Sequence, residues 1–189
     1  MPESQHKSGE EGLDFTKRWL ESTTWVELGF DAYTNPAVCT LERLDGKKKV
    51  WDLFGSIFHS PPTPLYVENK AYNNVGSQPA EYLEFLANAY SHTAKALKDG
   101  PDPRYEFMWV TTHPFDQTAW PTLTSPERIK KALDKDPGAC GEGGPDLSTL
   151  SLVSNRVWLL VLHERQNNLL LTPSELSNVE GLLNRKGKT

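Results

Sequence analysis

The residues from Val50 to Phe58 form a nearly continuous apolar stretch that is interrupted by one carboxylate, Asp52. A strand that is apolar on both faces is typical of the centre of a sheet that helices cover on both sides. A charged side chain in such a place is costly unless another group neutralises it. The stretch therefore predicts an α/β fold and makes Asp52 the residue that needs an explanation.

A further strand, Leu65 to Tyr72, is predicted after a proline-rich loop. Side chains alternate between the faces of a strand, so Glu68 and Lys70 share one face and Asn69 points to the other. If the two stretches are neighbouring strands, their backbones lie about 4.8 Å apart, and Asp52 and Glu68 can reach one cation. Two close carboxylates repel each other. Mg²⁺, which prefers oxygen ligands, is the cation that we expect to offset this repulsion. These residues predict a magnesium site, with Mn²⁺ as a substitute ion.

A water bound to that metal beside Lys70 is a nucleophile for phosphodiester hydrolysis. The lysine can orient the water, help to deprotonate it or stabilise the charge of the transition state. The opposite interpretation is an exposed Glu-Lys pair on a mixed strand with no metal. We favour the metal site because Asp52 lies in the preceding strand.

Asp52, followed sixteen residues later by Glu68-x-Lys70, resembles the active-site signature of the PD-(D/E)XK nuclease superfamily. The resemblance covers roughly residues 11 to 112. It implies a restriction-endonuclease-like α/β fold, with a mixed central sheet flanked by helices. It also implies that Asp52, Glu68 and Lys70 are catalytic, and that Asp52, Glu68 and the Asn69 carbonyl bind the metal. No other cofactor-binding residue is expected.

Members of this superfamily often carry a further acid on the first helix, just after an aromatic residue. Here Phe15 is followed by a threonine, and Glu11 lies four residues before Phe15, on the same helical face. Glu11 is therefore the additional acid that we expect, with Glu21 and Glu27 as alternatives.

The chain of 189 residues fits one domain, expected over 11–184, after a flexible lead-in at 1–10 and before a tail or linker at 185–189. Its net charge of −5 argues against a general nucleic-acid coat, because such proteins neutralise phosphates with Lys and Arg. Strong binding would then need a homo-oligomer, or a targeting or regulatory module fused to or associated with the domain.

The mean hydropathy of −0.56 is that of a soluble protein, and no apolar run approaches the ~20 residues of a membrane helix. The two cysteines, Cys39 and Cys140, lie far apart and suggest neither a zinc site nor a disulfide framework. A cytoplasmic location without membrane contact is the expectation.

Capping and turn residues predict the other elements. Helices are expected at Leu13–Leu28, from Ser77 to about Leu97, at Arg128–Lys135 and after Thr172, and strands at Ala37–Leu44, Tyr105–Thr112 and Arg156–Glu164. Asp45-Gly46 predicts a hairpin turn before Lys47, Lys48 and Lys49. We interpret these lysines as a solvated edge, with contact to phosphate as the alternative.

The candidate site predicts a metal-dependent nuclease, and the resemblance implies a Mg²⁺-dependent DNA endonuclease. Restriction or anti-phage defence is the setting in which such domains are most common, and it is expected here by analogy with the superfamily. One alternative is a catalytically inactive, nuclease-like module that binds nucleic acid or serves as a scaffold. A second alternative is an RNase that uses the same site. Metal-dependent nicking of DNA that is lost in Lys70→Ala and Asp52→Ala would favour the enzyme over the module.

Overall fold

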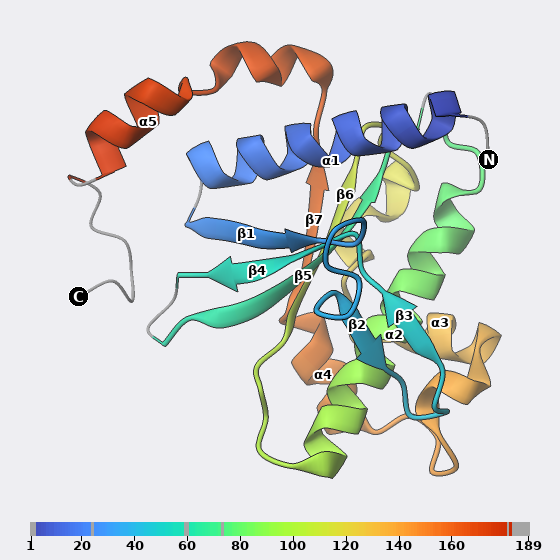
Figure 1. Cartoon of the computed structure of the whole chain (residues 1–189). Helices are drawn as coiled ribbons and strands as arrows, with labels where there is room; N and C mark the ends of the chain where they lie inside the picture. Colours follow the sequence, from blue (N-terminus) through green and yellow to red (C-terminus); the bar gives the residue numbers. More distant parts are fainter. Residues whose placement is uncertain (1–2, 24, 59–60, 73, 181, 183–189) are drawn as a thin grey trace.

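The computed structural model describes residues 3–23, 25–58, 61–72, 74–180 and 182, without the side chains of 3–11, 23 and 180. Figure 1 shows the chain as a central sheet with helices on both faces. The elements in chain order are α1 (Glu3–Thr23), β1 (Val26–Asp31), β2 (Thr40–Glu42), β3 (Lys48–Val50), β4 (Leu53–Ile57), β5 (Thr63–Lys70), α2 (Gln78–Asp99), β6 (Glu106–Thr111), η1 (Gln117–Thr122), α3 (Pro126–Lys135), η2 (Pro137–Cys140), α4 (Leu147–Ser154), β7 (Val157–Val161), η3 (Glu164–Leu169) and α5 (Pro173–Glu180).

The main sheet has five strands in the order β1-β4-β5-β6-β7. The pairs β1–β4 and β4–β5 are antiparallel, whereas β5–β6 and β6–β7 are parallel. The strands β2 and β3 form a separate antiparallel hairpin. The predicted α/β fold with a mixed central sheet is therefore confirmed.

The parallel pair β5–β6 is connected by α2, which begins and ends where the sequence predicts. Ser77 is its N-cap residue, a proline occupies its first turn, and Gly100 follows its last residue. The residue alternation of β5 decides which side chains face this helix. Tyr66 packs in the core under α2, and Val67 packs in the core under α1.

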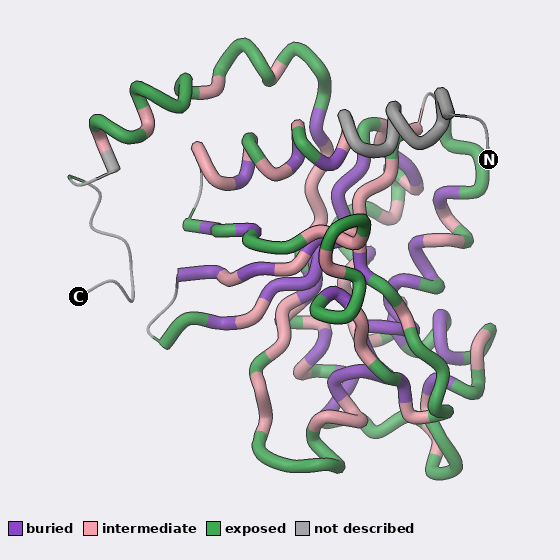
Figure 2. The backbone as a smooth tube through the Cα atoms, viewed as in Figure 1, coloured by how far each residue is buried: buried purple, intermediate pink, exposed green. Residues whose placement is uncertain are grey.

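Two hydrophobic cores fill the spaces on either side of the sheet. The larger core contains Trp51, Phe107 and Trp109 and lies under α2, α3 and α4. The smaller core contains Leu20, Val67 and Val110 and lies under α1. Figure 2 shows buried backbone concentrated in the strands and in α2, and mostly exposed backbone beyond β7.

The predicted helix Leu13–Leu28 is wrong at both ends. The observed α1 begins at Glu3 and ends at Thr23, and Val26–Asp31 pairs with β4 as an edge strand. The residues near the boundary include threonine, tryptophan and valine, which favour strands, and pairing with β4 prevails over the helical periodicity.

The pairing of β1 with β4 contains a bulge between Glu27 and Phe30. Gly55 of β4 lies against it so closely that a Cβ atom there would stand 1.9 Å from the Glu27 carbonyl oxygen and 2.7 Å from the Leu28 Cα atom. Only glycine fits at this position, because both neighbours are backbone atoms.

The proline-rich loop is shorter than predicted, since β5 already begins at Thr63 and includes Pro64. At these two residues β5 pairs with β4 alone, because β6 pairs from Leu65 onward. A proline is tolerated where the ladder needs no N–H donor.

The Thr172 capping box is confirmed by its reciprocal hydrogen bonds with Glu175. The helix α4 was not predicted.

Among the described residues, none of the helices combines the length and the apolar character that crossing a bilayer requires.

Candidate functional site

The sheet brings Asp52 and Glu68 together. Asp52 immediately precedes β4, and Leu53 of β4 pairs with Val67 of β5. Because the pair is antiparallel, the next opposite positions along the two chains are those of Asp52 and Glu68. The Asp52 Oδ2 atom accepts a hydrogen bond of 2.7 Å from the backbone N–H of Asn69. The predicted proximity of the two strands is therefore present, although Asp52 lies between β3 and β4, not inside a strand.

Burial raises the pKa of the Asp52 carboxyl group to about 6, and the charge of Glu68 adds to the effect. The hydrogen bond from Asn69 and the charges of Lys70 and Lys49 lower the pKa by less. The ionised form of Asp52 is therefore unfavourable in the folded protein near neutral pH.

Glu68 is neutralised by two ammonium groups. Its side chain is 6% exposed, and its Oε1 atom lies 2.9 Å from Lys49 Nζ and 3.0 Å from Lys70 Nζ. The Oε2 atom lies 2.8 Å from Lys49 Nζ. The positive charge for which the sequence suggested Mg²⁺ is supplied here by the protein itself.

Lys70 lies between two carboxylates, since its Nζ atom is also 3.4 Å from Glu81 Oε2. Burial lowers the pKa of Lys70, but the charge and hydrogen bond of Glu68, followed by the charges of Asp52 and Glu81, raise it to a value above that of a free lysine. A lysine that stays protonated at neutral pH cannot take a proton from a water, so the deprotonating role predicted for Lys70 does not fit this geometry.

Lys49 is the site residue that the sequence interpretation missed. Its Nζ atom pairs with Glu68 and lies 5.7 Å from the ring centroid of Trp51. The interpretation of the three lysines as a solvated edge therefore fails at Lys49, whereas Lys47 pairs with Asp45 and is 70% exposed. The alternation of an extended chain places Lys49 on the same face as the buried Trp51, and this pattern could have identified it.

Neither the Asn69 side chain nor the Glu11 side chain is observed next to Glu68. The Asn69 side chain lies on the opposite face of the sheet from Glu68, where its Oδ1 atom accepts a hydrogen bond of 2.7 Å from Thr16 of α1. Glu11 belongs to α1, but its side chain lies outside the described residues. Glu21, one alternative, accepts a hydrogen bond from the Leu28 N–H at the start of the sheet.

The site opens into a small cavity of about 80 Å³. It is lined by Lys49, Glu68, Lys70, Glu81, Glu84, Phe85 and Asn88. Because one water occupies about 30 Å³ of liquid, the cavity has room for a few waters or one phosphate-sized group, but not for a whole nucleotide.

The described part of the chain contains no group of three or more His, Cys, Asp or Glu side chains that could hold a metal ion. A divalent ion at Glu68 would also have to displace at least one ammonium group. Binding of Mg²⁺ or Mn²⁺ by Asp52, Glu68 and the Asn69 carbonyl therefore stays a prediction.

Comparisons with known proteins give structural matches alone. No protein-family model matches the chain, and no curated protein matches it. The Moraxella osloensis Cap4 SAVED/CARF-domain-containing receptor is similar over 93% of this chain and 36% of its own, at 14% identity and a TM-score of 0.35. The Acinetobacter baumannii Cap4 receptor with the cyclic trinucleotide 2′3′3′-cAAA is similar over 92% of this chain and 38% of its own, at 13% identity and a TM-score of 0.37.

The chain thus spans less than two fifths of the length of each receptor. These matches are described as receptors, and none of them is described as a nuclease. The predicted membership of the PD-(D/E)XK superfamily and the predicted function as a DNA endonuclease are therefore not borne out by these matches. The pairing of Glu68 with Lys49 and Lys70 does not support an enzymatic activity either.

The raised pKa of Asp52 gives a prediction for stability. A carboxyl group with a folded-state pKa of about 6 and an unfolded value near 3.8 contributes stability below pH 3.8 that is lost as the pH rises through 6. Asparagine cannot ionise, so Asp52→Asn is expected to raise the free energy of unfolding at pH 8 by about 1–3 kcal/mol. Urea unfolding at pH 8 and pH 4.5 measures the effect, which should shrink at the lower pH.

Asp134→Asn serves as the control for this prediction, because Asp134 is an exposed carboxylate paired with Lys130. It should change the unfolding free energy by less than about 0.5 kcal/mol at either pH. A loss of stability in Asp52→Asn at pH 8 would contradict this prediction, because it would show that the ionised Asp52 carboxylate stabilises the folded protein.

Proposed function

We propose that this chain is a non-catalytic binding module that holds the phosphodiester backbone of a short oligonucleotide at its lysine cluster, Lys47, Lys48, Lys49 and Lys70. The observation that carries the proposal is the convergence of Lys49 and Lys70 on the buried Glu68, from two different strands. Both lysine side chains remain partly exposed, at 25% and 29%, so each can donate to a ligand without leaving Glu68.

Two features of the site favour a phosphate at this position. An ammonium group has three donors, and the pairing with Glu68 leaves donors on each lysine for phosphate oxygens. The hairpin adds Lys47 and Lys48, which are exposed and precede Lys49 in the chain. A backbone with successive phosphates can pass from the exposed lysines of the hairpin to Lys49 and Lys70.

The overall charge sets the strength of the expected interaction. At a net charge of −5 the chain does not attract long nucleic acids, and Glu68, Asp52 and Glu81 offset part of the local positive charge. A short ligand that contacts about two phosphates should show a slope of log K against log salt of about −1.4. This expectation favours an oligonucleotide over a long duplex.

The first ligand to test is a cyclic oligoadenylate, because one of the similar receptors is described with 2′3′3′-cAAA. A linear single strand of similar length is the comparator. Direct comparison of the two ligands measures the preference for a cyclic over a linear backbone.

Fluorescence anisotropy with labelled 2′3′3′-cAAA and a labelled linear trinucleotide tests the module. Lys49→Gln and Lys70→Gln are each expected to weaken binding about tenfold, because each removes charge-assisted hydrogen bonds to phosphate. Lys130→Gln is the matched control, since Lys130 is an exposed lysine of α3 paired only at the surface with Asp134. It should bind like the wild type.

Two results would contradict the proposal. The first is equal binding by the wild type and both glutamine variants, which would place the ligand elsewhere. The second is cleavage of the oligonucleotide or of plasmid DNA with Mg²⁺ or Mn²⁺ that disappears in Lys70→Ala, which would make the protein an enzyme.

A further inference from the structure

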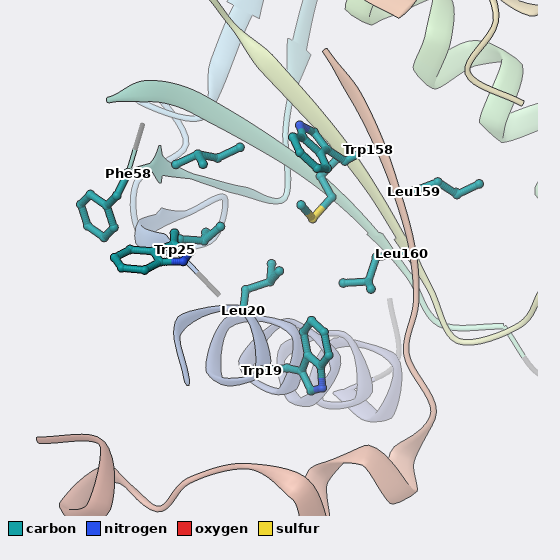
Figure 3. A pocket seen from close by; sticks show the side chains of 10 residues that line it. Trp19, Leu20, Trp25, Phe58, Trp158, Leu159 and Leu160 are labelled. Atoms are coloured by element: carbon teal, nitrogen blue, oxygen red, sulfur yellow. The ribbon is translucent and has the colours of Figure 1, made fainter. Parts of the chain in front are cut away.

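A larger cavity lies on the face of the sheet that α1 covers, away from the lysine cluster (Figure 3). Its volume is about 400 Å³, within the range of small-molecule sites. It is lined by Trp19, Leu20, Trp25, Val26, Ile57, Phe58, Met108, Trp158, Leu159 and Leu160. These side chains are all apolar or aromatic, so the cavity suits an uncharged ligand.

Three tryptophans from three separate segments surround this cavity. Trp19 belongs to α1, Trp25 to the link before β1, and Trp158 to β7. Figure 3 shows Trp19 and Trp158 on opposite sides of the space and Trp25 on a third. Single exposed aromatic residues are common on protein surfaces, but Trp25 and Trp158 are 37% and 43% exposed at the same concave site.

The ring of Trp158 is held in place before any ligand arrives. Its Nε1 atom donates a hydrogen bond of 2.8 Å to Glu106 Oε2, and its backbone pairs with Met108 of β6. A ring fixed in this way presents its face without losing much freedom on binding. The Glu106 carboxylate beside it disfavours an anionic ligand at this side of the cavity.

We propose that this tryptophan cavity binds a neutral, planar aromatic group of one or two rings, such as a nucleobase or an indole. Indole faces bind flat rings by stacking, and this preference distinguishes an aromatic ligand from an alkyl chain, which gains only from apolar contact. The volume accommodates such a ring system. The site goes beyond the proposed function and shares none of its residues.

Ligand-detected saturation-transfer NMR with adenosine and with indole tests this assignment. Both probes report an aromatic site, and their relative affinity distinguishes a nucleobase ligand from an indole-like one. Trp25→Ala and Trp158→Ala are each expected to weaken binding about tenfold, because base–aromatic stacking contributes about that much per ring. Trp158→Phe keeps a ring and should retain most of the affinity. Trp120→Ala is the matched control, since Trp120 is also 37% exposed but lies on η1.

Melting temperatures of all variants verify that each one is folded. The proposal is overturned if neither probe shows saturation transfer at millimolar concentration, or if both alanine variants bind like the wild type. Tighter binding of 1-octanol, an uncharged alkyl probe, than of either ring, at the same residues, would instead assign the cavity to an alkyl chain. Lys70→Gln should leave adenosine binding unchanged, so failure of this proposal and failure of the oligonucleotide proposal can be told apart.

Discussion

Replacing Arg43 by alanine is expected to lower the free energy of unfolding by about 3 kcal/mol, because it leaves two partly buried carboxylates and the buried Asn88 amide oxygen without their partner. The Arg43 side chain is 7% exposed and lies 3.1 Å from Asp45 and 2.7 Å from Asp136. It also donates a hydrogen bond of 3.1 Å to Asn88 of α2. The residue therefore fastens the β2–β3 hairpin to α2 and to η2.

Urea unfolding at pH 7 measures this loss, and Lys47→Ala is the control. Lys47 also pairs with Asp45, at 3.3 Å, but is 70% exposed, so its loss should cost less than about 1 kcal/mol. Because Lys49 belongs to the same hairpin, Arg43→Ala should weaken oligonucleotide binding as well. Equal stability of the two variants would show that the Arg43 network contributes no more than a surface pair.

Trp51→Ala is expected to destabilise the protein by a similar amount, about 3–5 kcal/mol. Trp51 is fully buried, and its ring lies 5.2 Å from Phe107, 5.7 Å from Phe85 and 5.7 Å from His92, measured between ring centroids. Removing the indole leaves a cavity under α2 and takes away the ring over which the Lys49 ammonium group lies. Chemical denaturation measures the loss.

Trp51→Phe is the informative companion to this variant. The Trp51 Nε1 atom is buried and has no hydrogen-bond partner among the described residues, so phenylalanine removes an unsatisfied donor while keeping an aromatic ring. Its cost should be well below that of alanine. A phenylalanine variant as unstable as the alanine variant would mean that the shape of the indole, and not aromatic packing in general, is required.

Local rules predicted the middle of the chain well. Ser77, the proline after it and Gly100 delimit α2, and the apolar run after them becomes β6, because these are signals that neighbours in the sequence supply. The boundary between α1 and β1 could not be predicted in the same way. Its strand exists through pairing with β4, which lies beyond it in the sequence.

The candidate site was predictable in its acids but not in its charge balance. Alternation along β5 and the pairing of adjacent strands brought Asp52 to Glu68 as expected. The sequence alone predicts a metal ion as the positive charge beside these acids, because local patterns indicate only a solvated edge for the hairpin lysines. The third of these lysines folds back over Trp51 to reach Glu68, and only the packing of β3 against the core shows this.

The bulge in β1 has a consequence for the behaviour of the protein in concentrated solution. An outermost strand with evenly spaced donors and acceptors is a template on which another chain can add a strand, the first step toward fibrils. The irregular register between Glu27 and Phe30 interrupts that spacing, and Gly55 makes the irregularity possible. This margin of the molecule is thereby protected against edge-to-edge aggregation.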